Sequence, residues 1–277
     1  MISDVDGGAP GDGRAAGAFG AWSAVALGAA SGWFTRGGPG GASVGPYLGW
    51  NLGGHVGDDA GAVALNRAAL DAAVGAPAWF VDQVHGRDVA LRNRAPRVAA
   101  GERSAGTADA LVLDARRSPV PLAGAILVAD CVPVLLATPD GLLAAAVHVG
   151  RAGLVAGALE ATLEALAGLD ARCAEQGCLR AAVGPSICGR CYEVSEELRD
   201  DVASAHPAAA AVTRWGTPGL DVGAGVRAVL GAFGVAADVS AARCTYECAD
   251  LYSYRRATHR GDGRTGRVAG VVRTAHV

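Results

Sequence analysis

Residues 125–149, AILVADCVPVLLATPDGLLAAAVHV, carry the pattern that decides the fold. The turn sequence Pro139-Asp140-Gly141 separates two apolar runs, which is typical of a β-hairpin. Cys131 and His148 stand at the ends of such runs, where a strand gives way to a loop and a site can open. The runs are short and almost wholly apolar, which predicts buried strands over 110–113, 125–129, 132–137 and 142–147.

Outward from this hairpin, the chain mixes helical and strand patterns. Asp58 and Asp59 start a helical pattern that ends near Val74, before Gly75 and Pro77. Further patterns predict helices over 154–169, from about 194 onward and over 222–233, strands over 179–183 and 268–272, and a Gly/Arg-rich loop over 255–267.

The chain shows no internal repeat and no clear linker, so we expect one α+β catalytic domain over residues 31–277. Residues 1–30 are rich in Gly, Ala and Asp, which predicts a flexible segment, with order beginning near Trp33. Acidic residues precede the first apolar stretch, where an export signal would need basic ones, and no run is apolar enough to span a bilayer. With an odd number of cysteines, 7, we expect a cytoplasmic protein without a disulfide framework, which binds no membrane.

The charged residues narrow the chemistry. The net charge is −3, which offers no basic face for nucleic acid, so we expect small-molecule substrates and a monomer or weak homodimer. All 24 basic residues are arginines, because the sequence has no lysine. This composition excludes Schiff-base and P-loop chemistry and leaves anions to be held by arginines, backbone amides or a metal.

Three short segments each present one metal-ligand side chain: Gln83-Val84-His85-Gly86, Ala129-Asp130-Cys131 and Val147-His148-Val149-Gly150. Two imidazoles and one thiolate suit Zn²⁺ with a fourth position open to substrate, as in catalytic zinc sites. Spacing alone leaves two alternatives. Cys131 can be an inert buried thiol, or it can be a nucleophile activated by His148 without a metal.

Other cysteines and arginines form weaker candidates. Cys188 and Cys191, together with Cys244 and Cys248, resemble a zinc knuckle, but ordinary reduced thiols are the preferred interpretation. Candidate anion-binding residues lie beside glycines, near a predicted helix start and after an aromatic segment; they are Arg36, Arg151 and the pair Arg255-Arg256.

Many motifs, in one order, make the chain from about residue 33 onward closely resemble the YfiH/DUF152 family, also called the multicopper polyphenol oxidoreductase (laccase) family, purine nucleoside phosphorylase-like or peptidoglycan editing factor. The motifs include FTRGG (34–38), NLG (51–53), HVGDD (55–59), QVHG (83–86), ADA (108–110), ADCVP (129–133), AVH (146–148), CYEV (191–194), YSYRR (252–256) and TGR (265–267).

The resemblance implies a layered, YfiH-like α/β/β/α fold with mixed sheets and a zinc site formed by His85, Cys131 and His148. It implies phosphorolysis of adenosine, inosine and methylthioadenosine, and deamination of adenosine. It also carries two competing activities: editing of a peptidoglycan precursor by amide hydrolysis, and copper-dependent phenol oxidation. We rank the copper activity lower, because one cysteine and few histidines do not supply the usual array of several coppers.

On this basis we expect Cys131, His148 and Arg36 to be catalytic. The expected substrate-binding residues are Asn51, which orients the sugar, Arg256, which holds phosphate together with Arg36, and also Arg151 and Tyr254. The chain departs from the family where Val149-Gly150-Arg151 stands in place of Ala-Gly-Trp, and in an insertion over 257–264. The resemblance therefore does not fix the substrate preference of this chain.

Overall fold

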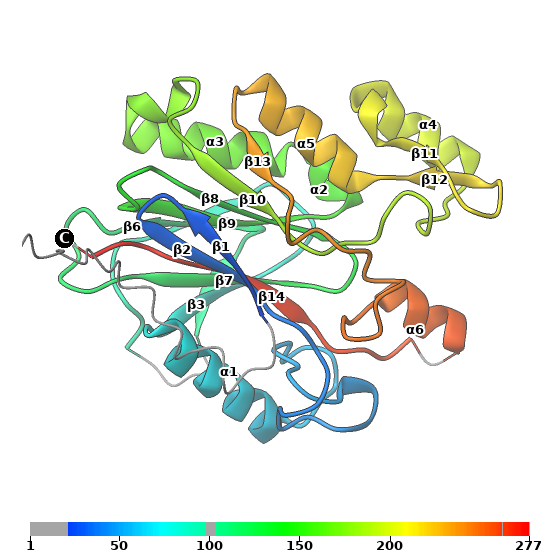
Figure 1. The fold of residues 1–277 in the computed structure, drawn as a ribbon, viewed down its shortest axis with the longest axis horizontal. Helices are drawn as coiled ribbons and strands as arrows, with labels where there is room; N and C mark the ends of the chain where they lie inside the picture. Colours follow the sequence, from blue (N-terminus) through cyan, green and yellow to red (C-terminus); the bar gives the residue numbers. More distant parts are fainter. Residues whose placement is uncertain (1–21, 98–102, 262, 277) are drawn as a thin grey trace, which may run out of the picture.

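Two six-stranded sheets stack face to face in the computed structural model, which describes residues 22–97, 103–261 and 263–276 (Figure 1). The first sheet has the order β1 (Ser23–Leu27), β2 (Ala30–Phe34), β14 (Val268–Arg273), β7 (Ala123–Val128), β3 (Ala78–Asp82) and β5 (Ser104–Thr107). The second has the order β13 (Ala237–Asp238), β10 (Arg180–Val183), β8 (Val132–Ala137), β9 (Leu143–Val149), β6 (Ala110–Asp114) and β4 (Val89–Arg92). Each sheet mixes parallel and antiparallel pairs.

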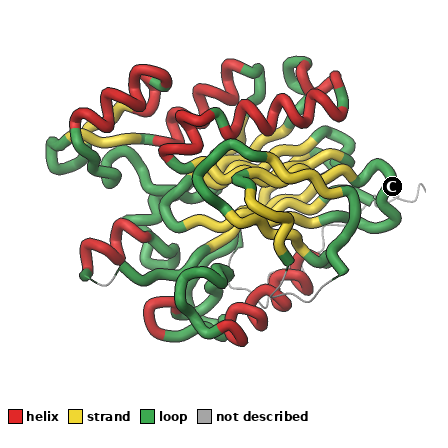
Figure 2. Tube along the Cα trace, turned by 180° about the vertical axis from the view of Figure 1, so that it is seen from behind, coloured by secondary structure: helices red, strands yellow, loops and turns green. Residues whose placement is uncertain are grey.

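Helices cover both outer faces of this pair of sheets (Figure 2). The helix α1 (Ala60–Val74) packs on the first sheet, and α2 (Arg151–Ala156), α3 (Ala158–Leu169) and α5 (Val222–Ala232) pack on the second. The remaining elements are α4 (Glu196–Ala205), the hairpin β11 (Ala210–Val212) and β12 (Pro218–Leu220), α6 (Tyr254–Arg260), and 3-10 turns at Gly45–Tyr47, Ala171–Ala174 and Pro207–Ala209. The predicted α+β fold with α/β/β/α layers is therefore confirmed.

Three apolar layers hold the stack together. The layer between the sheets contains Leu27, Phe34, Leu111, Ile126 and Leu135, all at most 1% exposed. A second layer joins the second sheet to its helices, and a third joins the first sheet to α1. Because β7, β8 and β9 are buried on both faces, their sequences are continuous apolar runs instead of alternating ones.

The predicted hairpin and the first helix are also confirmed. The strands β8 and β9 pair in antiparallel register, with Pro133 opposite His148. The Asp59 side chain caps α1 by accepting a hydrogen bond from the backbone N–H of Ala62 at 2.8 Å. Gly75 ends the same helix in the left-handed conformation, with φ of 74°.

Three local features differ from the predictions. The apolar helix predicted over 154–169 is divided, because Gly157 adopts a left-handed φ of 81° between α2 and α3. The Gly/Arg-rich loop contains α6, which begins where the Ser253 side chain accepts a hydrogen bond from the N–H of Arg256. Regular structure is already present at β1, before Trp33, because β1 pairs with β2; residues 1–21 of the predicted flexible segment lie outside the described residues.

Among the helices of the described chain, none has the length and apolar character needed to cross a membrane.

Candidate metal centre

The three predicted ligands converge, although their positions in the chain span residues 85–148. The ligand atoms of His85, Cys131 and His148 all lie within 4.8 Å of one another. Cys131 Sγ is 3.6 Å from His85 Nε2, and the two imidazole rings meet edge to face with centroids 4.7 Å apart. We refer to this group as the His-Cys-His centre; its two nitrogens and one sulfur are a donor set that suits Zn²⁺.

The centre lies where the two sheets meet. His85 follows β3 of the first sheet, His148 belongs to β9 of the second, and Cys131 lies in the turn that joins β7 to β8 across the two sheets. Two residues of these turns have left-handed backbones that non-glycine residues rarely adopt: φ is 61° at His85 and 100° at Asp130. Such conformations cluster at functional sites, where the surrounding structure holds them in place.

Asp109, a fully buried residue just before β6, organises the centre. Its carboxylate lies 2.8 Å from His148 Nδ1 and also accepts hydrogen bonds from the backbone N–H groups of Val84 (3.2 Å), His85 (2.9 Å) and Gly86 (2.6 Å). The bond to Nδ1 makes that nitrogen the donor, which leaves Nε2 of His148 free to act as a ligand. Asp109 therefore fixes one ligand directly and another through its backbone.

The ligands perturb one another electrostatically. Burial alone would raise the pKa of the Cys131 thiol, but the positive charge and hydrogen bonds of His148 and a hydrogen bond from His85 lower that pKa to about 6. Burial opposes protonation of His148, but the Cys131 thiolate and Asp109 raise its pKa to about 9. The centre thus favours a thiolate at neutral pH, which is the form that binds metals and attacks electrophiles.

Gly150 has no side chain, which leaves space for the ligands to meet. A Cβ at this position would lie 2.6 Å from Cδ2 of His85 and 3.1 Å from Sγ of Cys131. Every larger residue would therefore push at least one ligand out of place.

The centre opens into a pocket of about 750 Å³, large enough for a small organic substrate. Three arginines line it: Arg151 at the start of α2, Arg255 in α6, and Arg267 before β14. Asp130 is the one acidic residue among the described lining residues, and its carboxylate already accepts hydrogen bonds from the Thr245 hydroxyl and the Arg255 N–H. The pocket therefore has a surplus of positive charge. Its other lining residues include Tyr192, Tyr254, His55, His259 and Gln83.

Two predicted substrate-binding residues, Arg151 and Tyr254, do line this pocket, whereas Arg36, Asn51 and Arg256 do not. Arg36 forms an ion pair with Asp250 at 3.1 Å.

Asn51 and Arg256 hold backbone segments in place. Asn51 is fully buried, and its Oδ1 accepts a hydrogen bond from the backbone N–H of Arg267 at 2.8 Å. The Arg256 guanidinium donates to the carbonyl oxygens of Thr245, Tyr246, Cys248 and Leu251. Arg36, Asn51 and Arg256 thus lie outside the lining of the pocket, and the direct roles expected for them stay predictions.

Sequence reasoning missed Asp109, Arg267 and the preference for Arg255 over Arg256. A signal existed for Asp109, since it is an acidic residue immediately before a wholly apolar strand. None existed for the arginines, because a sequence does not say which of two neighbouring side chains faces a pocket.

The architecture and the centre together define a class of α/β/β/α proteins with two histidines and one cysteine at a pocket between the sheets. Residues 31–275 match the family model described as multi-copper polyphenol oxidoreductase laccase. The chain belongs to this family, as the sequence motifs predicted.

Curated relatives match most of the chain. A protein of Streptomyces coelicolor named purine nucleoside phosphorylase is 49% identical over 236 residues, which cover 84% of this chain and 91% of the relative. A protein of Mycobacterium tuberculosis with the same name is 40% identical and covers 84% of this chain and 88% of its own.

Solved structures share the fold. A Neisseria meningitidis protein of the DUF152 family has a TM-score of 0.74 at 30% identity, covering 92% of this chain and 99% of its own. YlmD from Geobacillus stearothermophilus has a TM-score of 0.73 at 26% identity, covering 90% of this chain and 93% of its own.

Proposed function

We propose that this chain is a zinc-dependent enzyme that phosphorolyses adenosine, inosine and methylthioadenosine, and that also deaminates adenosine. The observation that carries the proposal is the His-Cys-His centre at an arginine-lined pocket of about 750 Å³. Relatives 40% and 49% identical to this chain are named purine nucleoside phosphorylases, which supports the choice of substrate.

The donor set favours zinc. A thiolate and two imidazoles match the ligands of catalytic zinc sites, in which three protein ligands leave one position for substrate. When bound, zinc would supply Lewis-acid polarisation of a substrate oxygen or nitrogen. His85, Cys131 and His148 would hold it, and Asp109 would keep His148 in the tautomer that presents Nε2.

Phosphorolysis needs a site for an anion. A phosphate oxygen bonds to C1′ of the ribose as the bond from C1′ to the purine breaks, and the purine takes up a proton. Arg151, Arg255 and Arg267 supply the positive charge that positions phosphate in a chain without lysine. Arg255 is already oriented, because its guanidinium donates to the carbonyl of Glu193 at 2.7 Å.

Aromatic side chains suit the purine. Tyr254 is 54% exposed at the pocket, so one face of its ring is available for stacking. Tyr192 also lines the pocket, with the Arg255 guanidinium 5.0 Å from its ring centroid. We assign Tyr254 to the base and the three arginines to phosphate.

Incubation with substrates tests the proposal. The purified protein, supplied with Zn²⁺, is incubated with adenosine and phosphate, and the products are separated by chromatography. We expect adenine and ribose 1-phosphate, and inosine from the deamination, while Cys131→Ala gives none of them. Elemental analysis of protein purified without added metal distinguishes zinc from copper. Absence of every product from zinc-loaded wild-type protein would refute the proposal.

A metal-free cysteine hydrolase is a second candidate. Asp109 hydrogen-bonds to His148, His148 interacts with Cys131, and the pKa of the Cys131 thiol is lowered. An aspartate that orients a histidine, which in turn activates a thiol, is the arrangement of a nucleophilic triad. Full activity in protein stripped with EDTA would favour this candidate, and recovery on adding Zn²⁺ would favour the zinc enzyme.

A further inference from the structure

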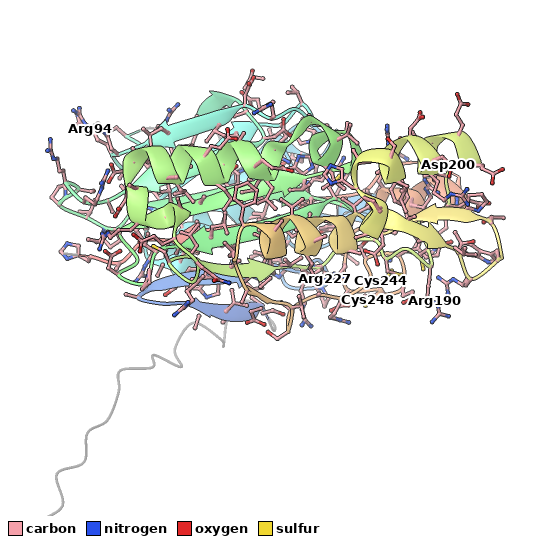
Figure 3. All side chains as sticks on the ribbon, turned by 90° about the horizontal axis from the view of Figure 1, so that it is seen from above. Arg94, Arg190, Asp200, Arg227, Cys244 and Cys248 are labelled. Carbon is pink, nitrogen blue, oxygen red and sulfur yellow. The ribbon has the colours of Figure 1, made fainter. Side chains whose placement is uncertain are left out.

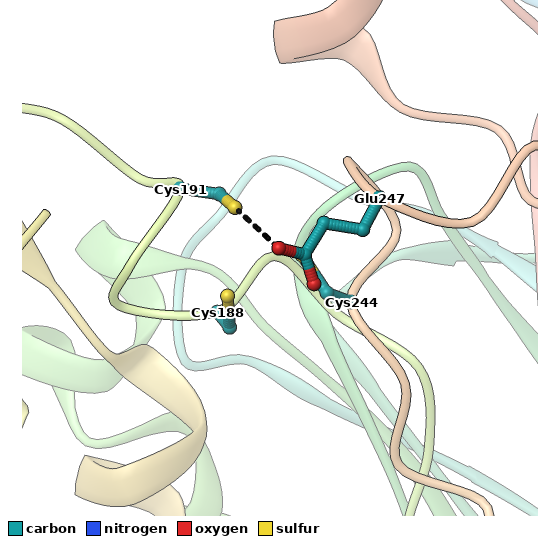
Figure 4. Close-up of side chains that lie close together, drawn as sticks. All are labelled: Cys188, Cys191, Cys244 and Glu247. Carbon is teal, nitrogen blue, oxygen red and sulfur yellow. Dashed lines mark hydrogen bonds between the residues drawn. The ribbon is translucent and has the colours of Figure 1, made fainter. Parts of the chain in front are cut away.

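A second group of potential metal ligands, three thiols and one carboxylate, lies outside the pocket, on loops between the larger elements. It consists of Cys188, Cys191, Cys244 and Glu247, which we call the thiol cluster (Figure 4). Their ligand atoms all lie within 4.8 Å of one another, and Cys191 Sγ is 3.6 Å from Glu247 Oε1. None of the four lines the pocket of the His-Cys-His centre, so the proposed nucleoside chemistry does not use them.

Two turns hold the cluster. The first lies between β10 and α4, where the N–H groups of Cys191 and Tyr192 both donate to the Cys188 carbonyl, at 2.9 and 3.0 Å. The second precedes α6, where the Cys248 N–H donates to the Cys244 carbonyl at 3.0 Å. This turn directs Glu247 into the cluster.

Backbone hydrogen bonds tie the two turns to each other. The N–H of Ser186 donates to the Arg243 carbonyl, and the N–H of Thr245 donates to the Ser186 carbonyl, each at 3.0 Å. The sulfurs of Cys188 and Cys244 are therefore brought together by fixed backbone and not by flexible side chains alone.

Cys248 is one turn away from Cys244, and both lie on the same side of the molecule as Arg190 (Figure 3). Cys248 packs against the layer between the sheets and contacts Arg243 instead of joining the cluster. The sequence pattern thus pointed to the two segments that meet here, but it named Cys248 where the structure places Glu247. This difference matters, because a Cys-x₂-Cys pair with one more thiol and a carboxylate is a complete set of four ligands.

We propose that the thiol cluster binds a structural Zn²⁺ ion, held by Cys188, Cys191, Cys244 and Glu247. A tetrahedral zinc with Zn–S bonds of about 2.3 Å needs ligand atoms about 3.8 Å apart, so the observed spread requires shifts of about 1 Å at most. All four positions are filled by the protein, which distinguishes a structural site from a catalytic one.

Arg214, in the loop between β11 and β12, contacts two members of the cluster. Its Nη2 donates to Cys191 Sγ at 2.6 Å, and its Nη1 is 3.3 Å from Glu247 Oε1. Three thiolates and a carboxylate carry more negative charge than Zn²⁺ balances, so an arginine beside them is favourable. Hydrogen bonds to ligand sulfurs are a common outer feature of metal sites.

The site would brace one wall of the pocket. Ile187 and Tyr192 line the pocket and belong to the turn that carries Cys188 and Cys191. The Ile187 N–H donates to the Asp130 carbonyl at 2.9 Å, next to Cys131. Zinc in the thiol cluster would therefore hold the wall without contacting the substrate.

Metal content tests the inference. Full-length protein is purified under reducing conditions with Zn²⁺ and analysed for metal per chain. We expect two zinc ions in the wild type, one in Cys131→Ala, one in the double variant Cys188→Ser/Cys244→Ser, and none in the combined triple variant. Cys248→Ser is the matched control, a neighbouring cysteine outside the cluster, and should retain two.

A second measurement guards against misfolding of the double variant. In Cys131→Ala protein, Co²⁺ should give a thiolate charge-transfer band, and this band should be absent from the triple variant that also carries Cys188→Ser/Cys244→Ser. EDTA should lower the melting temperature of the Cys131→Ala protein but not that of the triple variant. Two zinc ions in the double variant, or none in Cys131→Ala, would overturn the inference, as would a disulfide among the three cysteines in zinc-supplied reduced protein. Loss of one zinc from the double variant supports it even if nucleosides are not substrates.

Discussion

The His-Cys-His centre and the thiol cluster use similar side chains but are built in different ways. His85, Cys131 and His148 come from the ends of strands in both sheets and open into the pocket. The thiol cluster comes from two loops and does not line that pocket, and Arg214 contacts Cys191 and Glu247. The first offers three ligands and the second four.

Under the two proposals, this difference would give the sites different tasks. A centre with three protein ligands leaves a position for substrate, whereas four ligands complete the coordination of zinc and leave none. Strand ends hold reacting groups rigidly, which suits catalysis. Loops gain more than strands do from an added cross-link, because they have fewer other contacts to hold them.

We expect the largest effect from a substitution that disrupts only the His-Cys-His centre. Cys131→Ala removes the thiolate and should lower kcat/KM for adenosine phosphorolysis by about 10³-fold or more, equivalent to about 4 kcal/mol of transition-state stabilisation. Cys188→Ser should cost much less, because Cys188 does not line the pocket. Steady-state kinetics of both variants measure the contrast, and equal losses would mean that the two clusters do not have separate tasks.

Asp109→Asn tests the hydrogen bonds that hold the ligands of the His-Cys-His centre in place. The amide can no longer hold the His148 Nδ1–H and the three backbone N–H groups as a carboxylate does. We expect zinc affinity at this centre to fall by about 10- to 100-fold, as measured by competition with a chromophoric chelator. Zinc in the thiol cluster should be unchanged, and a loss there as well would point to general misfolding.

Gly150→Ala should have a smaller effect. The new Cβ would meet His85 and Cys131, so we expect about tenfold weaker zinc binding at the His-Cys-His centre. Gly168→Ala in α3 is the control, because no atom lies within 4 Å of its Cβ position. It should leave zinc binding unchanged and raise stability by up to about 1 kcal/mol in thermal unfolding. Unaltered zinc affinity in the Gly150 variant would contradict the tight packing seen here.

The smallest expected effect concerns thiol reactivity in zinc-stripped protein. Because the pKa of Cys131 is lowered to about 6, its alkylation by iodoacetamide should reach half its maximal rate near pH 6, well below the usual cysteine range. The gain in rate at pH 7 is modest, since thiolate nucleophilicity falls with pKa, so the pH midpoint is the quantity to follow. Mass spectrometry of the Cys131 peptide gives that midpoint. In His148→Ala it should move upward; an unchanged midpoint would exclude His148 as the cause.

Local patterns were enough to predict β6 to β10, β14, the hairpin and α1, because burial leaves continuous apolar runs and capping leaves Asp59 and Gly75. Cys131 and His148 could be placed at the ends of such runs, whereas their grouping with His85 in one centre was implied chiefly by the resemblance to the family. Tertiary partners could not be predicted. Arg36 finds Asp250 at a separation of 214 residues, and the left-handed Gly157 divides a helix that the apolar pattern made continuous.

The centre lies where the two sheets meet, so its geometry depends on how the sheets pack against each other. His85 follows a strand of one sheet and His148 belongs to the other, and the Asp109 carboxylate hydrogen-bonds to both residues. Any shear of one sheet over the other changes the distance between the ligands. A cavity at a distance from the centre, as in Phe34→Ala in the layer between the sheets, would therefore change the distances between the ligands. On heating, the protein would lose activity before it unfolds.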